Sequence, residues 1–192
     1  MSQHKGFQVE VSKEVIRRAK RGEVDAFEQI YLTYFTASHA LAMRICGQTA
    51  MAEDIVQESF IKMMHNIQKY RGDGLFAGWL SRIVTHETIN RIKGNAKVHL
   101  VGDEVLDNKE SKDLFSYNWL DACSDIEALL ENLSAVSRAV FLLHEVEGFN
   151  HKEIAELFDK TESFSKVTLS RAYAKLRKVV TMPQKESESA FK

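Results

Sequence analysis

The sequence has one proline and two cysteines among its 192 residues, and no long apolar run. Cys46 and Cys123 form no CxxC pair, which argues against a zinc site and is typical of a reducing compartment. No uninterrupted apolar stretch reaches about 18 residues, so neither a membrane-spanning helix nor a secretion signal is expected. These absences predict a cytoplasmic protein with no membrane insertion, no metal and no cofactor.

Strand patterns are also scarce, because few β-branched runs alternate with a period of two. The single proline, Pro183, lies near the C-terminus. Apolar residues instead recur at three- and four-residue spacing over residues 24–45, 56–67, 79–93 and 126–143, which predicts long helices. A shorter helix over 13–21 has Ser12 as a suitable N-cap. In the second long run the residues expected to face the core are Val56, Phe60, Met63, Met64 and Ile67.

Charge is unevenly distributed along a chain that is nearly neutral as a whole. Lys plus Arg number 26 and Asp plus Glu number 27. Residues 62–97 hold seven basic residues against two acids, and residues 163–180 hold five basic residues and no acid. Between them, residues 101–131 hold nine acids against two lysines. Two basic blocks separated by an acidic one predict two polyanion-binding surfaces joined by a solvated linker.

The C-terminal part has the outline of a helix-turn-helix. Asn150 and Glu153 form a capping-box pattern at the start of a short helix, HKEIAELF, over residues 151–158. The turn DKTE follows, and Thr161 is a suitable N-cap for a longer basic helix. A short helix, a tight turn and a basic helix are typical of DNA-binding units of this kind.

The two faces of this longer helix carry different residues. Leu169, Ala172 and Leu176 are spaced to face the core. The opposite stripe offers cations, hydroxyls and one small apolar group, which suit phosphates and base edges in a major groove. Its members are Ser163, Lys166, Val167, Ser170 and Arg171. A merely solvated face is the alternative, but the absence of acids favours DNA binding. Phe164 fits either packing under the turn or contact with DNA.

A stretch rich in glycine and aromatic residues, KYRGDGLFAGWLSRI (residues 69–83), lies between two amphipathic runs. It follows a helix and lacks the Lys-Ser/Thr pair of a P-loop, so it does not predict a phosphate cradle. The nearby HETIN (residues 86–90) has Asn where the zinc-protease motif HExxH has its second ligand, so metal-dependent hydrolysis is not expected. An aromatic, basic loop leading into a basic helix instead favours the stacking of unpaired bases.

Two segments resemble extracytoplasmic-function (ECF) sigma factors, the small specificity subunits of bacterial RNA polymerase. EDIVQESFIKMMHNIQKYRGDGLFAGWLSRIVTHETINRIK (residues 53–93) is similar to their second conserved region. LLENLSAVSRAVFLLHEVEGFNHKEIAELFDKTESFSKVTLSRAYAKLRK (residues 129–178) is similar to their fourth region. The likeness extends over about residues 20–96 and 126–180, and the two regions occur in the order that the family has.

The resemblance implies roles for the matching residues. Those that would dock on the clamp of the largest subunit of core RNA polymerase are Asp54, Gln57 and Glu58. Those in the loop that takes an extruded base of the promoter minus-ten element are Tyr70, Arg71 and Phe76. The following helix would contact the same element through Trp79, Arg82, His86, Asn90 and Lys93. The stripe from Ser163 to Arg171 would read the minus-thirty-five element, and the helices before it would bind the flap of the second large subunit.

The prediction is therefore an all-α protein with two helical domains joined by a flexible acidic linker. Residues 10–96 correspond to sigma region 2, 97–124 to the linker, 125–181 to region 4 and 182–192 to a tail. The family likeness implies a transcription initiation factor that binds core RNA polymerase and promoter DNA, melts the duplex, and is held by an anti-sigma factor. It implies no enzymatic activity. The alternatives are a stand-alone helix-turn-helix regulator and an interaction protein that only sequesters a partner.

Several positions depart from the family pattern. Asp159 stands where the turn has Gly, and Asp adopts a left-handed conformation less readily. Ser165 stands where the family has an apolar core residue. Gly78, His86 and Asn90 also differ, so the resemblance does not define the promoter sequence.

Overall fold

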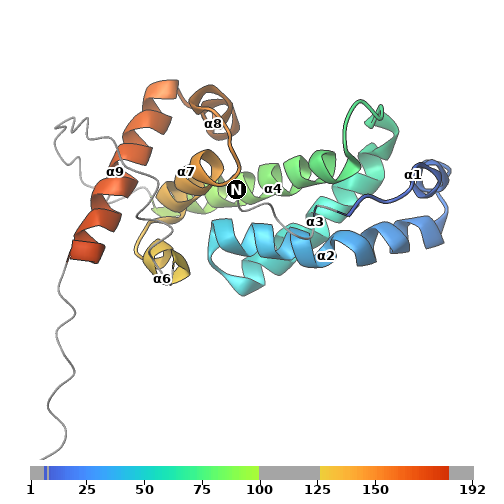
Figure 1. The fold of residues 1–192 in the computed structure, drawn as a ribbon, viewed down its shortest axis with the longest axis horizontal. Helices are drawn as coiled ribbons and strands as arrows, with labels where there is room; N and C mark the ends of the chain where they lie inside the picture. Colours follow the sequence, from blue (N-terminus) through green and yellow to red (C-terminus); the bar gives the residue numbers. More distant parts are fainter. Residues whose placement is uncertain (1–6, 8, 100–125, 182–192) are drawn as a thin grey trace, which may run out of the picture.

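A computed structural model describes Phe7 and residues 9–99 and 126–181, and the regular structure in these residues is helical (Figure 1). The α-helices are α1 (Lys13–Lys20), α2 (Val24–Cys46), α3 (Thr49–Asn66), α4 (Phe76–His99), α6 (Ile126–Glu131), α7 (Ala135–Glu145), α8 (His151–Phe158) and α9 (Glu162–Thr181). A 3-10 turn, η2, spans Ile67–Lys69. The all-α prediction is confirmed. Helix α4 continues into the first three residues of the predicted linker; the rest of the linker and the tail lie outside the described residues.

Helices α1 to α4 form the N-terminal bundle, in which α2, α3 and α4 pack against one another. Its core includes Ile30, Tyr34, Ile55 and Leu80, each at most 1% exposed. Within each helix the apolar residues recur at helical spacing, so they lie on one face. Burying that face holds each helix against the others. At the start of α1, Ser12 Oγ accepts a hydrogen bond from the Val15 amide at 3.3 Å, as predicted.

The start of α4 is capped from a distant part of the chain. The amides of Phe76 and Ala77 both donate to the carboxylate of Glu10, each at 3.2 Å. A carboxylate at this end satisfies free amides and faces the positive end of the helix dipole, and α4 has no acid of its own in its first turn. The sequence predicted that this helix begins at Trp79, which is three residues too late. The earlier start could not be predicted from neighbouring residues, because the capping residue Glu10 lies 66 residues before Phe76.

Replacing Glu10 by alanine is expected to lower the free energy of unfolding by about 1 kcal/mol, the usual contribution of a helix cap. Urea denaturation of the full chain measures this change. Glu28→Ala on α2 is the matched control, because Glu28 is exposed and the same charge is removed. If both variants lose the same stability, Glu10 does not act as a cap.

Helices α6 to α9 form the C-terminal bundle. Ser134 Oγ accepts from the Ser137 amide at 3.3 Å and caps α7, as predicted. Helices α7, α8 and α9 contact one another around a core that includes Val140, Leu143, Ile154 and Leu176, each at most 1% exposed. The predicted inner face of α9 is confirmed, since Leu169, Ala172 and Leu176 are all buried.

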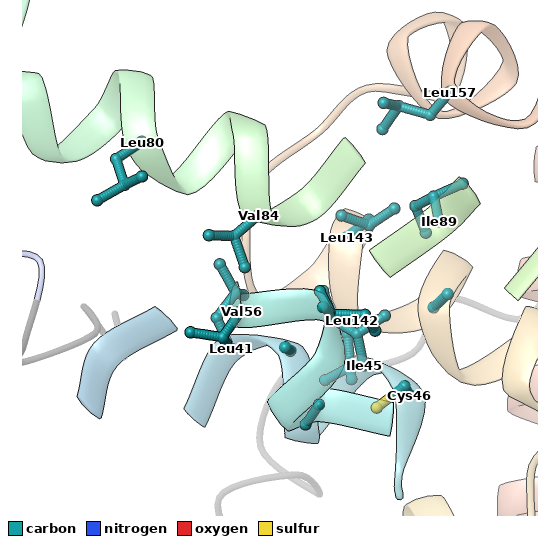
Figure 2. Packing of buried hydrophobic residues seen from close by; sticks show 14 of the residues in the cluster. Leu41, Ile45, Cys46, Val56, Leu80, Val84, Ile89, Leu142, Leu143 and Leu157 are labelled. Atoms are coloured by element: carbon teal, nitrogen blue, oxygen red, sulfur yellow. The ribbon is translucent and has the colours of Figure 1, made fainter. Parts of the chain in front are cut away.

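The two bundles also pack against each other. Helix α7 contacts α2 and α4, and α8 contacts α4, so the buried residues of both bundles form one hydrophobic cluster. Figure 2 shows Leu142 and Leu143 of α7 in the same cluster as Ile45 of α2 and Ile89 of α4. Figure 1 shows α1 and α9 at opposite ends of the molecule. The sequence predicted two helical units but not the contact between them.

Candidate nucleic-acid interface

Three aromatic rings gather where the loop of residues 70–75 leads into α4. The rings of Tyr70, Phe76 and Trp79 have centroids 5.2–5.5 Å apart. Tyr34 of α2 supports them, with its ring 5.9 Å from that of Phe76. Tyr70 and Trp79 are half-buried, whereas Phe76 has no exposed surface. The cluster therefore presents two partly accessible rings on a buried third.

The complete burial of Phe76 contradicts its predicted position in the loop. It is the first residue of α4, and its ring lies between those of Tyr34, Tyr70 and Trp79. A base cannot reach this ring without displacing its neighbours. Phe76 is therefore a core residue that supports the two more accessible rings.

The loop is closed by polar contacts around Tyr70. Its hydroxyl donates to the Gly74 carbonyl at 2.5 Å, and its own carbonyl accepts from Lys20 Nζ at 2.6 Å. The same ammonium lies 5.8 Å from the centre of the Tyr70 ring, within the range of a cation–π contact. Gly72 has a φ of +85°, a conformation that glycine adopts without strain. Burial raises the pKa of the Tyr70 hydroxyl, and Glu10 and Asp73 raise it further.

Three of the residues predicted to contact the minus-ten element form an exposed stripe on α4. Arg82, His86 and Asn90 follow one another at four-residue spacing and are all exposed, and Arg71 is exposed in the loop. Lys93 is half-buried at the C-terminal end of this stripe. Its ammonium donates to the Leu157 carbonyl at 3.3 Å and forms an ion pair with Asp159. The C-terminal bundle thus engages Lys93, while the rest of the stripe stays accessible.

The predicted polymerase-binding residues lie together on the outer face of α3. Asp54, Gln57 and Glu58 are all exposed. Two apolar residues, Ile61 and Met64, continue this face and are 48% and 46% exposed. The sequence predicts that both Met63 and Met64 face the core. Met63 does so, with 1% of its surface exposed, but the prediction for Met64 is wrong. The predicted docking face is therefore partly apolar.

The predicted DNA-reading stripe lies on the outer face of α9. Ser163, Lys166, Ser170 and Arg171 are exposed, and Val167 is half-buried between them. Lys166 forms an exposed ion pair with Glu162 at 3.4 Å, a contact that binding to phosphate can exchange at little cost. Cations and hydroxyls are thus exposed along one face of a single helix, as expected of a groove-reading element.

The turn before α9 is well defined. Asn150 and Glu153 form the predicted capping box at the start of α8, and Thr161 Oγ1 accepts from the Phe164 amide at 3.4 Å. Asp159 has a φ of 53°, and it is the only non-glycine residue with positive φ in the described ranges. Phe164 is half-buried with its ring 5.5 Å from that of Phe158, so it packs under the turn.

The structure gives little support to other kinds of site. Within the described residues, no group of three or more His, Cys, Asp or Glu side chains could hold a metal ion. Cys46 is buried, and burial raises the pKa of its thiol, which disfavours the reactive thiolate. None of the helices that the structure describes is both long and apolar enough to cross a membrane.

Two family models match the two helical bundles. The one described as Sigma-70 region 2 matches residues 30–98, and the one described as Sigma-70, region 4 matches residues 123–176. Together they cover more than half of the 192 residues. The chain therefore belongs to the sigma-70 family, and its relatives place it among the ECF sigma factors.

Among those relatives, the ECF RNA polymerase sigma factor SigW of Bacillus subtilis (strain 168) is 37% identical over 93 residues, which cover 48% of this chain and 50% of SigW. SigE of Mycolicibacterium smegmatis is 30% identical over 122 residues, covering 60% of this chain and 46% of SigE. The matched part thus spans about half the length of these two relatives. The RNA polymerase sigma-H factor of Pseudomonas aeruginosa is 27% identical, covering 76% of this chain and 81% of that protein.

The fold resembles that of a solved sigma factor. The sigma factor RpoE from Bartonella quintana, in a co-crystal structure with the anti-sigma factor NepR, aligns with a TM-score of 0.50 and 20% identity. The alignment covers 84% of this chain and all of that one.

Proposed function

We propose that this chain acts as an ECF-type RNA polymerase sigma factor in the cytoplasm. It binds core RNA polymerase, recognises the promoter minus-ten and minus-thirty-five elements and promotes DNA melting. The observation that most supports the proposal is that one chain carries two separate surfaces suited to DNA. The aromatic cluster and exposed stripe of α4 suit unpaired bases, and the exposed stripe of α9 suits a major groove.

Each bundle then has its own task. Residues 10–96 bind the polymerase clamp through the outer face of α3 and hold the minus-ten element on α4. Residues 125–181 bind the polymerase flap and read the minus-thirty-five element. Extruding a base costs a few kcal/mol, and stacking it on Tyr70 or Trp79 returns about 1–3 kcal/mol per base. The factor therefore favours the melted state without making or breaking a covalent bond.

A footprint of the full chain on promoter DNA, with and without core polymerase, tests this proposal. A sigma factor protects both elements only when the core enzyme is present. It also co-elutes with that enzyme in size-exclusion chromatography. A stand-alone helix-turn-helix regulator protects one site without the core enzyme. Tight binding of the chain alone, with no association with the core enzyme, would favour the regulator and overturn the proposal.

The contact between Lys93 and Asp159 leads to a prediction about DNA affinity. Asp159→Asn is expected to strengthen binding of the full chain to single-stranded minus-ten DNA, because it frees the Lys93 ammonium for phosphate. An ion pair with so exposed a carboxylate contributes at most about 1 kcal/mol, so the gain is at most about fivefold. Fluorescence anisotropy measures it. Glu156→Gln on α8 removes the same charge from an exposed site, and an equal gain for both variants would contradict the prediction.

We also propose that an anti-sigma factor binds this chain. The support comes from the family and from the RpoE structure, which was solved with an anti-sigma factor bound. Such a partner would compete with core polymerase for the chain. A binding partner that leaves the association with core polymerase intact would not be an anti-sigma factor.

A further inference from the structure

Helix α4 contains a single acidic residue, Glu87, beside the stripe predicted to contact the minus-ten element. Two residues of that stripe are its near neighbours, His86 one position before it and Asn90 three positions after it. Side chains three residues apart on a helix adjoin each other, with Cβ atoms about 5–6 Å apart. A carboxylate at this place therefore lies close to any DNA strand that the stripe binds.

This carboxylate is held between two helices by a cation of α3. The Glu87 side chain is 13% exposed, and its Oε2 accepts a hydrogen bond from Lys62 Nζ at 2.5 Å. Helices α3 and α4 pack against each other, so the ion pair joins them at their junction. Removing a carboxylate from water is costly unless it is paired, and Lys62 supplies the opposite charge.

Lys62 lies between the two surfaces predicted on the N-terminal bundle. Its ammonium is 3.9 Å from Glu58 Oε1, which belongs to the predicted polymerase-docking face. That contact is an exposed pair within one helix, and such pairs contribute little. The shorter and more buried contact with Glu87 therefore determines where the Lys62 ammonium lies.

The ion pair also cancels a charge that would oppose DNA binding. Proteins bind the negative phosphate backbone through cations, and Arg82 is the exposed arginine of the α4 stripe. An unpaired Glu87 would repel the phosphates that Arg82 attracts. Arg91, four residues after Glu87, is exposed, so a carboxylate that turned to it would move outward. Lys62 instead keeps the carboxylate against α3.

We infer that Lys62 is a positioning residue for minus-ten recognition: by pairing with Glu87 it holds this carboxylate against α3 and keeps the DNA-contacting face of α4 free of negative charge. The inference rests on the proposed function and extends its minus-ten surface to a residue of α3. Lys62 acts through Glu87 and does not itself touch DNA. Its role is also distinct from polymerase docking, the predicted role of Glu58 on the same helix.

The test measures binding of the full chain to a single-stranded oligonucleotide from the minus-ten region of a promoter that the chain transcribes. Fluorescence anisotropy gives the affinity. Lys62→Ala should weaken binding about three- to tenfold, because an unpaired carboxylate then lies beside the bound strand. Lys62→Arg keeps the cation and should stay within about twofold of the wild type. Unchanged affinity of Lys62→Ala would overturn the inference.

Removing the carboxylate together with the cation should restore binding. Lys62→Ala with Glu87→Gln has the net charge of the wild type and no acid on α4, so its affinity should return to within about twofold. The matched control is Lys62→Ala with Glu28→Gln, which has the same net charge but keeps Glu87, since Glu28 is exposed on α2. This control should keep the full defect.

Two outcomes of this comparison would overturn the inference. Rescue by both double variants would mean that only the overall charge matters. Rescue by neither would mean that Lys62 contacts DNA itself or is needed for the fold.

Salt provides a second readout, one that a general disturbance of the fold would not change. Repulsion between charges is screened as ionic strength rises, because the Debye length falls from about 10 Å at 0.1 M to about 3 Å at 1 M. The ratio of wild-type to Lys62→Ala affinity should therefore fall toward one between about 0.05 and 0.5 M salt. A ratio that stays constant over this range would contradict a role based on charge.

Binding to core polymerase separates this inference from the proposed function. Lys62→Ala should co-elute with the core enzyme as the wild type does. A loss of that association as large as the loss of DNA binding would make Lys62 a docking residue and overturn the inference. A wild-type chain that starts no transcript at any promoter would contradict the proposed function itself.

Discussion

Replacing Phe76 by alanine is expected to lower the free energy of unfolding by about 3–5 kcal/mol, the usual cost of removing a buried Phe side chain. The ring has no exposed surface and touches the rings of Tyr34, Tyr70 and Trp79. Its loss would leave a cavity under the start of α4 and remove the support of the two accessible rings. Because a domain of this size has a total stability of about 5–15 kcal/mol, this loss would remove a large share of it.

Urea denaturation of the full chain measures this loss directly. Phe76→Leu is the control, since it keeps an apolar side chain in the site and should lose clearly less stability. A Phe76→Ala protein with wild-type stability would contradict the packing described for α4.

Tyr70→Ala should behave differently from Phe76→Ala. Tyr70 is partly accessible, so its loss should impair promoter opening more than closed-complex binding. Stacking of one base contributes about 1–3 kcal/mol, which corresponds to about a 5- to 150-fold effect on opening. Equal losses in opening and in closed-complex binding would count against a base-stacking role for Tyr70.

The second large effect is expected on α9. A double variant, Lys166→Ala with Arg171→Ala, should weaken binding of the polymerase complex to the minus-thirty-five element by about tenfold to a hundredfold. If each cation contacts one phosphate, the slope of log affinity against log salt concentration should fall by about 0.9 per residue. A titration at several salt concentrations gives both quantities.

The matched control removes two cations from the opposite end of the molecule. Lys13 and Arg17 are exposed on α1, which Figure 1 places far from α9. Lys13→Ala with Arg17→Ala changes the net charge equally, so any larger effect of the α9 variant reflects its position. Equal effects of the two double variants would mean that α9 attracts DNA only through the overall charge.

Local patterns in the sequence predicted most of the fold. The caps at Ser12, Ser134 and Thr161 and the capping box of α8 depend on residues within three positions of one another, and all are present. Asp159, which stands where the family has Gly, adopts a left-handed conformation although Asp does so less readily. Such features could be predicted because their geometry is set by neighbours along the chain.

Features that depend on distant residues were missed or misplaced. The true start of α4 depends on Glu10, and the burial of Phe76 depends on Tyr34 of another helix. The contact between Lys93 and Asp159 arises only when the two bundles pack together. Helical periodicity gives the face of a helix but not its partner, so none of these contacts could be derived from spacing alone.

The central claim is that this chain directs initiation by RNA polymerase. Its most direct test is to mix the purified full chain with core polymerase, nucleotides and a pool of bacterial promoter fragments, and to map the 5′ ends of the transcripts. The account predicts transcripts that start at defined positions only when both proteins are present, and that are lost with the Lys166 and Arg171 double variant. Transcription that is unchanged when the chain is omitted, or that never starts at a defined site when it is present, would contradict the account.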